Sequence, residues 1–442
     1  MTEATAPAYP PRAKAWGSAV IVFLLTAIAL ADRMAISMLI GPIKAEFGLG
    51  DFQASLLIGF AFTLFYVIFL LPIGAAADKY SRARVLGVCL FVWSITTVAC
   101  GFATGFISLF VLRMLMGAGE AGIGPCSHGI IGASFPRHEL SKPLALQGIG
   151  FQVGPAIGVA AAGGILGAGA AGAFEGIPLL QDLAPWRVAF ILIGLPGLLA
   201  LALIPLLHDP DRARQTSAAT TAAPKVPIMP FLRQHRVLMT LMFFGSGISA
   251  MSAGVLTGWV PEYLQRSLGV SPVEAGSMLG LIMLSTALLG QGTYAAIVDW
   301  LAARGVLDAP LRIGILPTAL SVPLAWIAFS AESTDSFYLL LFAFALVSAP
   351  FNAINNTVAQ MIAPPALRSR ISALLIFSIS IIGFAIGPSL VGALSEYVLG
   401  EERLGEAMRM VATGAMAVTT VLFFLARNHL LRTMQAKAAA EA

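Results

Sequence analysis

Residues 110–125 read FVLRMLMGAGEAGIGP and place two charged side chains within an apolar run that extends from Gly105 to Phe135. A run of this length can cross a bilayer as a helix. Arg113 and Glu120 are seven residues apart, which returns them to nearly the same helix face about 10 Å apart along the axis. Because charges at membrane depth are costly unless they pair or face a cavity, this stretch predicts a functional site. A buried ion pair that only fixes helix packing is the alternative.

The composition is that of an integral membrane protein embedded in a lipid bilayer. Of 442 residues, 58% are hydrophobic and 11% are charged, and the mean hydropathy is +0.87, whereas soluble chains carry about 25% charged residues. The net charge of +4 does not indicate nucleic-acid binding, because the basic residues are spread over short loops. Three cysteines without ligand spacing, and no phosphate-binding G-x-x-x-x-G-K-[ST] loop, predict neither a metal site nor a cofactor.

Twelve apolar runs predict an all-α membrane protein with twelve transmembrane helices in two six-helix halves. The runs lie near 16–43, 52–77, 85–102, 105–135, 140–170, 186–207, 237–265, 272–302, 312–330, 336–362, 370–398 and 405–427. The least apolar part of the interior, residues 208–236, predicts a linker between two bundles. The expected domains are an N-terminal tail at 1–15, a bundle at 16–207, the linker at 208–236, a second bundle at 237–432 and a C-terminal tail at 433–442.

The charges of the loops predict the orientation of the chain in the membrane. With the N-terminus inside, most lysines and arginines fall in cytoplasmic segments. The outer loops then hold few basic residues: Lys44, Arg187, Arg266, Arg403 and Arg409. This bias follows the positive-inside rule. We therefore expect both termini and the linker in the cytoplasm, and a monomer in a bacterial-type inner membrane or a plasma membrane.

The two halves repeat each other in two places. A glycine-proline pattern in the fifth run recurs in the eleventh, at Gly150, Gly154, Pro155 and Gly158 and again at Gly383, Gly387, Pro388 and Gly392. The loop at 74–84, GAAADKYSRAR, follows the second run, and a shorter version follows the eighth run at 299–304. Two repeated bundles joined by a long linker suit alternating access, with the substrate site between them near the middle of the membrane.

The loop at 74–84 resembles the signature between the second and third spans of the major facilitator superfamily, and the resemblance extends from Trp16 to about Arg432. It implies the major facilitator fold. It also implies that acidic and basic residues of these loops latch helix ends in one conformational state, here Gly74, Asp78, Arg82 and Arg84 with Asp299 and Arg304. The glycine-proline pattern at 150–158 is similar to the antiporter signature of that family, although helix packing alone could produce it.

A narrower resemblance is to the spinster family of lipid transporters. It is carried by Asp32-Arg33 in the first run and by RMLMGAGEA at 113–121 in the fourth. Members of that family are associated with sphingosine phosphate and lysophospholipids, so the resemblance implies a single-chain amphiphile as substrate. The sequence departs from the family at Leu30-Ala31, where Asn-Tyr is frequent, and this leaves the exact substrate open.

The depth of the charges along the first and fourth runs predicts one cluster, formed by Asp32, Arg33, Arg113 and Glu120. The four charges of the cluster sum to zero, and charges that neutralise one another have a lower free-energy cost at this depth than an unpaired charge. Arg113 is level with Asp32, so we expect these two in close contact and Glu120 partly dependent on Arg33. If the pairing changes between outward and inward states, one carboxylate gains and loses a proton in each cycle. We expect this to be Glu120, with Asp32 second.

The tenth run carries neutral polar residues on one helix face: Ser348, Asn352, Asn355 and Asn356. We interpret them as hydrogen-bonding partners for the head group of a substrate. Packing between helices is the alternative, because asparagine also bonds well between helices in lipid.

These features together predict a secondary transporter, coupled to protons, that moves an amphipathic lipid-like molecule by alternating access. A carrier of small organic anions or drugs is the main alternative, because two arginines could bind such anions equally well. A membrane enzyme would need a nucleophile or His/Asp/Glu cluster at head-group level, and the sequence shows none. A receptor would not need two repeats with paired latches.

Overall fold

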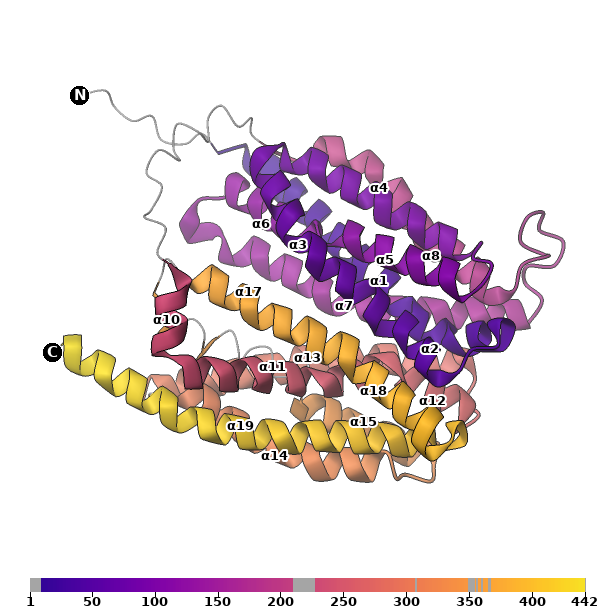
Figure 1. Ribbon diagram of the computed structural model, residues 1–442. Coiled ribbons are helices and arrows are strands. Elements are labelled where there is room, and N and C mark those ends of the chain that lie inside the picture. The colour runs from indigo at the N-terminus through magenta and orange to yellow at the C-terminus, as the bar shows by residue number, and fades with distance from the viewer. Residues whose placement is uncertain are drawn as a thin grey trace. The chain divides into compact units, whose positions relative to one another are not determined.

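The computed structural model describes residues 9–209, 227–306, 308–348, 354, 357–358, 361–364 and 367–441. Within these residues all regular structure is helical (Figure 1). Eleven described helices are long and apolar enough to cross a membrane, and the shorter apolar helix α15, Thr334–Ser348, supplies a twelfth. The predicted all-α fold with twelve helices is thus confirmed.

The first six spans contain breaks at glycines and at short π-helical or 3₁₀ segments. The second span is α2 continued through a π-helical turn into α3, and the fourth is α5 followed, after Ala121-Gly122, by α6. Their bounds are α1 Arg12–Phe47, α2 Asp51–Ser55, the π-turn Leu56–Phe60, α3 Ala61–Lys79, α4 Arg82–Cys100, α5 Phe106–Glu120, α6 Ile123–Ser134, α7 Ser141–Ala170 and α8 Pro185–Ala200, with 3₁₀ turns at Arg137–Glu139 and Leu201–Leu206.

The last six spans are interrupted in the same manner. The seventh span breaks between α11 and α12, where Pro261 lacks an amide hydrogen. The bounds are α10 Ile228–Gln234, α11 Arg236–Gly258, α12 Val260–Arg266, α13 Pro272–Ala302, α14 Ala309–Ala328, α15 Thr334–Ser348, α17 Arg368–Ser378, the π-segment Ile379–Ile386, α18 Gly387–Leu394, the π-turn Ser395–Leu399, the 3₁₀ turn Glu401–Arg403 and α19 Leu404–Glu441.

The contacts divide the chain into two compact units, and the division does not follow the order of the chain. One unit is Met1–Leu39 with Leu64–Thr221, and the other is Ile40–Thr63 with Ala222–Ala442. The end of α1, all of α2 and the π-turn after it therefore pack with the second unit. Most of the expected linker at 208–236 lies outside the described residues, so the domain boundaries predicted from the sequence stay predictions.

The repeated glycines pack helices closely in both units. In the first unit, a Cβ added to Gly154 would lie 2.6 Å from the Ala27 carbonyl oxygen of α1. In the second unit, a Cβ added to Gly383 would lie 2.3 Å from the Ala250 side chain of α11. Only glycine permits such a close approach of two helices. Helix packing alone therefore explains the glycines of the repeated glycine-proline pattern at these positions.

Candidate functional site

The charged pair of the first unit joins α1 to the end of α5. Arg33 Nη2 and Nε donate hydrogen bonds to Glu120 Oε2 at 2.9 and 3.1 Å. The Glu120 side chain is fully buried, while 24% of the Arg33 side chain is exposed. The Arg33 guanidinium also lies 5.0 Å from the centre of the Tyr66 ring on α3, a cation–π distance. The expected dependence of Glu120 on Arg33 is therefore present.

The other two charges of the cluster are buried beside this pair. Asp32 lies within electrostatic range of Glu120 and Arg113. Arg113 is fully buried on α5, and its Nη1 lies 3.4 Å from Met116 Sδ. Neither carboxylate oxygen of Asp32 has a hydrogen-bond partner among the described residues. The expected close pairing of Asp32 with Arg113 is therefore not a hydrogen bond in this structure.

This arrangement treats the two carboxylates differently. Glu120 binds a guanidinium through one oxygen, whereas Asp32 is buried with no charged hydrogen-bond donor in contact and only the Thr97 hydroxyl nearby. A buried ionised carboxylate that lacks hydrogen bonds is expensive, because its lost hydration is not replaced. A proton or a change of partner would remove that cost. Among the described residues no group of three or more His, Cys, Asp and Glu side chains could hold a metal ion.

The residues of the first predicted latch lie where α3 ends and α4 begins. Arg82 Nη1 donates to the Gly129 carbonyl oxygen of α6 at 3.3 Å, and Gly74 lies opposite Pro125. Asp209 accepts hydrogen bonds from the Ser81 hydroxyl and, at 3.1 Å, from the Ala83 amide. This start of α4 is therefore capped by a carboxylate from beyond α8. Asp78 occupies the last turn of α3, and Arg84 the first turn of α4.

The second predicted latch and the polar face of the tenth span belong to the second unit. Arg304 stacks on the Trp300 ring at 3.5 Å and donates to the Trp300 carbonyl oxygen at 3.2 Å, close to Asp299 in sequence. Ser348 donates to the Ala345 carbonyl oxygen of its own helix at 3.3 Å. Asn352, Asn355 and Asn356 lie outside the described residues. The latch and the head-group contacts stay predictions.

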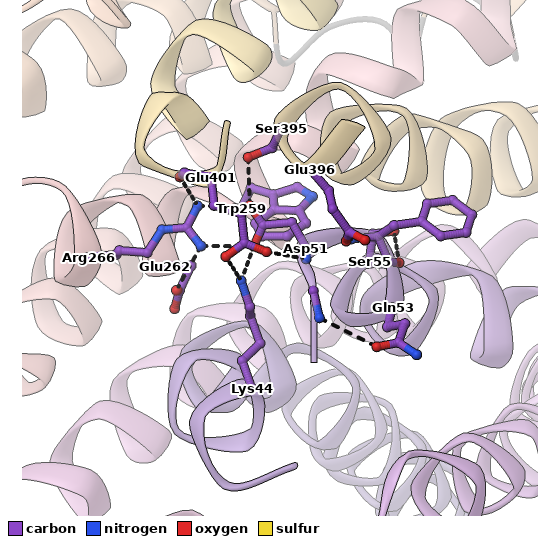
Figure 2. Close-up of polar contacts among 12 residues, drawn as sticks. Lys44, Asp51, Gln53, Ser55, Trp259, Glu262, Arg266, Ser395, Glu396 and Glu401 are labelled. Atoms are coloured by element: carbon purple, nitrogen blue, oxygen red, sulfur yellow. Dashed lines mark hydrogen bonds and ion pairs between the residues drawn. The ribbon is translucent and has the colours of Figure 1, made fainter. Parts of the chain in front are cut away.

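A second ionic cluster, which we call the Asp51 cluster, lies wholly within the second unit and was not predicted. It consists of Lys44, Asp51, Arg266, Ser395 and Glu401 (Figure 2). Arg266 binds the fully buried Asp51 carboxylate through two parallel hydrogen bonds of 2.8 and 2.9 Å. The Ser395 hydroxyl donates to the same carboxylate at 2.6 Å, and the Lys44 ammonium also contacts it. Asp51 thus joins the ends of α1, α12 and the π-turn at 395–399 to α2.

Glu401 of the Asp51 cluster and the neighbouring Glu396 also bind the first turn of α2. Glu401 accepts from the Asp51 amide at 3.0 Å, and Glu396 accepts from the Phe52 amide at 2.8 Å. Glu401 also binds Lys44 at 3.1 Å, and Glu262 Oε1 lies 3.6 Å from Arg266 Nη1. The residue before α2 is Gly50, which has no side chain to cap the helix. The first two amides of α2 are therefore satisfied by residues more than 300 positions away in the sequence.

The Asp51 cluster escaped the sequence analysis because its members fall at the ends of predicted spans. Lys44 and Arg266 look like interfacial charges there, and their positions indicate only the orientation of the chain. The available signal was their shared depth: Asp51 begins one span and Arg266 ends another at the same expected membrane surface. Opposite charges at one level can pair, but the sequence does not give the rotation of each helix.

A family model described as Major Facilitator Superfamily matches residues 22–388. The MFS-type efflux pump of Mycolicibacterium smegmatis is 26% identical over 416 residues, which cover 93% of this chain and 92% of the relative. Protein spinster of Drosophila melanogaster is 25% identical over 447 residues, which cover 96% of this chain and 71% of the relative.

A solved structure resembles this one over nearly its whole length. It is the crystal structure of a bacterial homolog of the human lysosomal transporter spinster, in an inward-facing and unoccupied conformation. The TM-score is 0.81 with 22% identity, and the match covers 96% of this chain and 99% of that chain. At 22% identity, this match supports a shared fold and nothing further.

Proposed function

The chain belongs to the major facilitator superfamily of membrane transporters, and on that premise we propose that it moves an amphipathic substrate of the sphingolipid or lysolipid type by proton-coupled alternating access. The resemblance to the spinster family that Asp32-Arg33 and 113–121 predicted is confirmed by a relative and by a solved structure. The chain is a multi-pass membrane protein and a transporter, not an enzyme. The single observation that carries the coupling mechanism is the buried charge cluster of the first unit.

The unequal partners of the two carboxylates support the proposal of proton coupling. Asp32 is buried without a charged hydrogen-bond donor in contact, whereas Glu120 binds Arg33. In this state Asp32 carries the proton and Glu120 is paired. If Arg33 moves to a substrate anion, Glu120 loses its partner and takes up a proton in turn. The sequence favoured Glu120 as the first proton carrier, and the geometry favours Asp32.

The Asp51 cluster supplies the conformational half of the proposal. It fastens residues 40–63, which are early in the chain, to helices of the second half. In an alternating-access cycle, such a fastening holds in one state and releases in the other. Release exposes Asp51 and Arg266 to water, which returns most of their lost hydration. The free energy of opening is then the difference between the free energy of the Asp51–Arg266 ion pair and the hydration free energy of the two separated side chains.

The substrate class rests on the Arg33 guanidinium and on the spinster relative. Arg33 is the partly exposed member of its cluster, so it is the group that can meet an anionic head. A relative named Sphingosine-1-phosphate transporter SPNS2, of Mus musculus, favours a lipid-like substrate. A relative named Hexuronate transporter, of Bacillus subtilis, favours the second candidate, a carrier of small organic anions or drugs.

A chain-length series of one lysophospholipid head group separates these two candidates. Each buried methylene adds up to ~0.8 kcal/mol, so the affinity for a lipid substrate rises by up to about fourfold per methylene until the site is full. Uptake into proteoliposomes, with and without a pH gradient, gives the matching transport rates. A flat response to chain length, with tight binding of a short carboxylate, would end the lipid proposal and leave the transporter standing.

The orientation inside the membrane needs its own test. We propose that both termini and the linker lie in the cytoplasm. Cysteines placed at Ser217 and Glu402, in a chain without its three native cysteines, are then labelled by an impermeant maleimide from opposite sides. Labelling of both from one side contradicts the topology.

A further inference from the structure

A groove of about 550 Å³ lies on the first unit, between α3 and α4, with α5 as its floor. Phe69 and Ile73 of α3 and Val88 and Val92 of α4 form its apolar walls. The floor is made by Ala118 and Gly119 of α5. The groove is separate from the charge cluster, because its lining includes none of the four charged residues.

The length of the groove matches one leaflet of a bilayer. Its lining on α4 extends from Arg84 to Val92, and on α3 and the residue after it from Phe69 to Tyr80. From first to last residue these stretches advance by eight and eleven positions, or about 12 and 16 Å along a helix. Half of a hydrocarbon core is about 15 Å thick. An extended acyl chain parallel to the helices therefore fits between the head-group level and the middle of the membrane.

Only one end of the groove is polar. Tyr80, Ser81 and Arg84 line that end. Arg84 is exposed; its backbone amide donates to the Ser81 hydroxyl at 3.3 Å, and its guanidinium has no hydrogen-bond or ion-pair partner among the residues that the structure describes. The neighbouring charges are Lys79, Arg82, Asp78 and Asp209, of which Arg82 and Asp209 are held by hydrogen bonds. The end is thus net positive, and Arg84 is available to a ligand.

We propose that this groove binds one anionic diacyl phospholipid of the surrounding bilayer, with an acyl chain between α3 and α4 and its phosphate at Arg84. Charge complementarity selects the anionic head, since a basic residue near a membrane surface favours anionic lipid. The apolar walls select the chain. The groove is distinct from the proposed transport pathway. The lipid-binding proposal therefore does not depend on the proposed transport function.

The test is native mass spectrometry of the full-length protein, delipidated and then titrated with phosphatidylglycerol or phosphatidylcholine of the same acyl chains. The wild type binds one phosphatidylglycerol about fivefold more tightly than phosphatidylcholine, the factor for one basic residue. Val88→Trp fills the groove and abolishes this binding. The control Phe91→Trp, on the same helix at an exposed position outside the groove, leaves it unchanged.

Arg84→Gln provides a second, surface variant in case Val88→Trp does not fold. It removes the fivefold preference for phosphatidylglycerol and keeps the weaker binding of either lipid. Equal binding of the two lipids by the wild type, an unchanged preference in Arg84→Gln, or full binding by a folded Val88→Trp overturns the proposal. Transport assays do not enter this test, so failure of the proposed transport function leaves its outcome readable.

Discussion

Replacing Asp51 by asparagine is the sharpest perturbation of the Asp51 cluster. The Asp51 side chain is fully buried and binds Arg266, Lys44 and Ser395. Removing one partner of a buried ion pair costs about 3–5 kcal/mol. Arg266 is 25% exposed and keeps Glu262 at 3.6 Å, so part of that cost is offset. We expect Asp51→Asn to weaken the closed arrangement by about 2 kcal/mol, which is about a 30-fold shift of a two-state equilibrium.

Ser55 gives this shift a direct readout. It is fully buried on α2, where the Gly392 position of α18 faces it at close range. A Ser55→Cys reporter, in a chain without native cysteines, reacts with a maleimide only when α2 leaves α18. When opening is fast, the reaction rate follows the open population. Asp51→Asn should therefore raise the rate about 30-fold.

A matched control and a double-mutant cycle make the result decisive. Arg403 and Glu406 form an ion pair at 2.9 Å in the same unit, but Arg403 is 52% exposed. Such pairs contribute at most about 1 kcal/mol. Arg403→Gln should therefore change the rate of maleimide labelling at Ser55→Cys by no more than about fivefold. Asp51→Asn and Arg266→Gln should be non-additive, because they remove the same pair. Additive effects, or equal rates for Asp51→Asn and Arg403→Gln, would refute the reasoning.

Two further predictions concern the first unit. Asp32→Asn and Glu120→Gln should each strongly reduce proton-driven transport in proteoliposomes while the protein stays folded, and full pH-dependent transport in the double variant would remove the proton hypothesis. Gly154→Leu should destabilise the protein by 1–3 kcal/mol or more, because its Cβ would lie 2.6 Å from the Ala27 carbonyl oxygen. The control Gly164→Leu, on the same helix with open space around it, should unfold at the wild-type temperature in a detergent melt, and an equal loss in both variants would contradict this account.

The sequence predicted the quantities that depend on depth in the membrane. Apolar runs give the number of helices, and the positions of Arg33 and Glu120 along their helices predicted that the two could meet. Asp32 and Arg113 lie within electrostatic range of each other but form no hydrogen bond, because equal depth does not fix which way each side chain points around its helix. A buried charge cluster is therefore easier to predict than its internal bonds.

The Asp51 cluster shows the other limit of the sequence. Arg266 is 215 residues from Asp51, and Glu401 is 350 residues away. No local pattern links such positions, and each of them is an ordinary residue for the end of a span. Only the packing of α2 against α18, where Gly392 faces Asp51 and Ser55, brings them together.

The cap of α2 has a consequence for hydrogen exchange. The Asp51 and Phe52 amides donate to Glu401 and Glu396, and Gly50 offers no side chain that could replace them. When the segments separate, the first turn of α2 must turn to water or fray. When opening is fast, these two amides should exchange with solvent deuterium in proportion to the open population, while the amides of α18 stay protected. Exchange at the start of one short helix thus reports how much of the protein has the Asp51 cluster open.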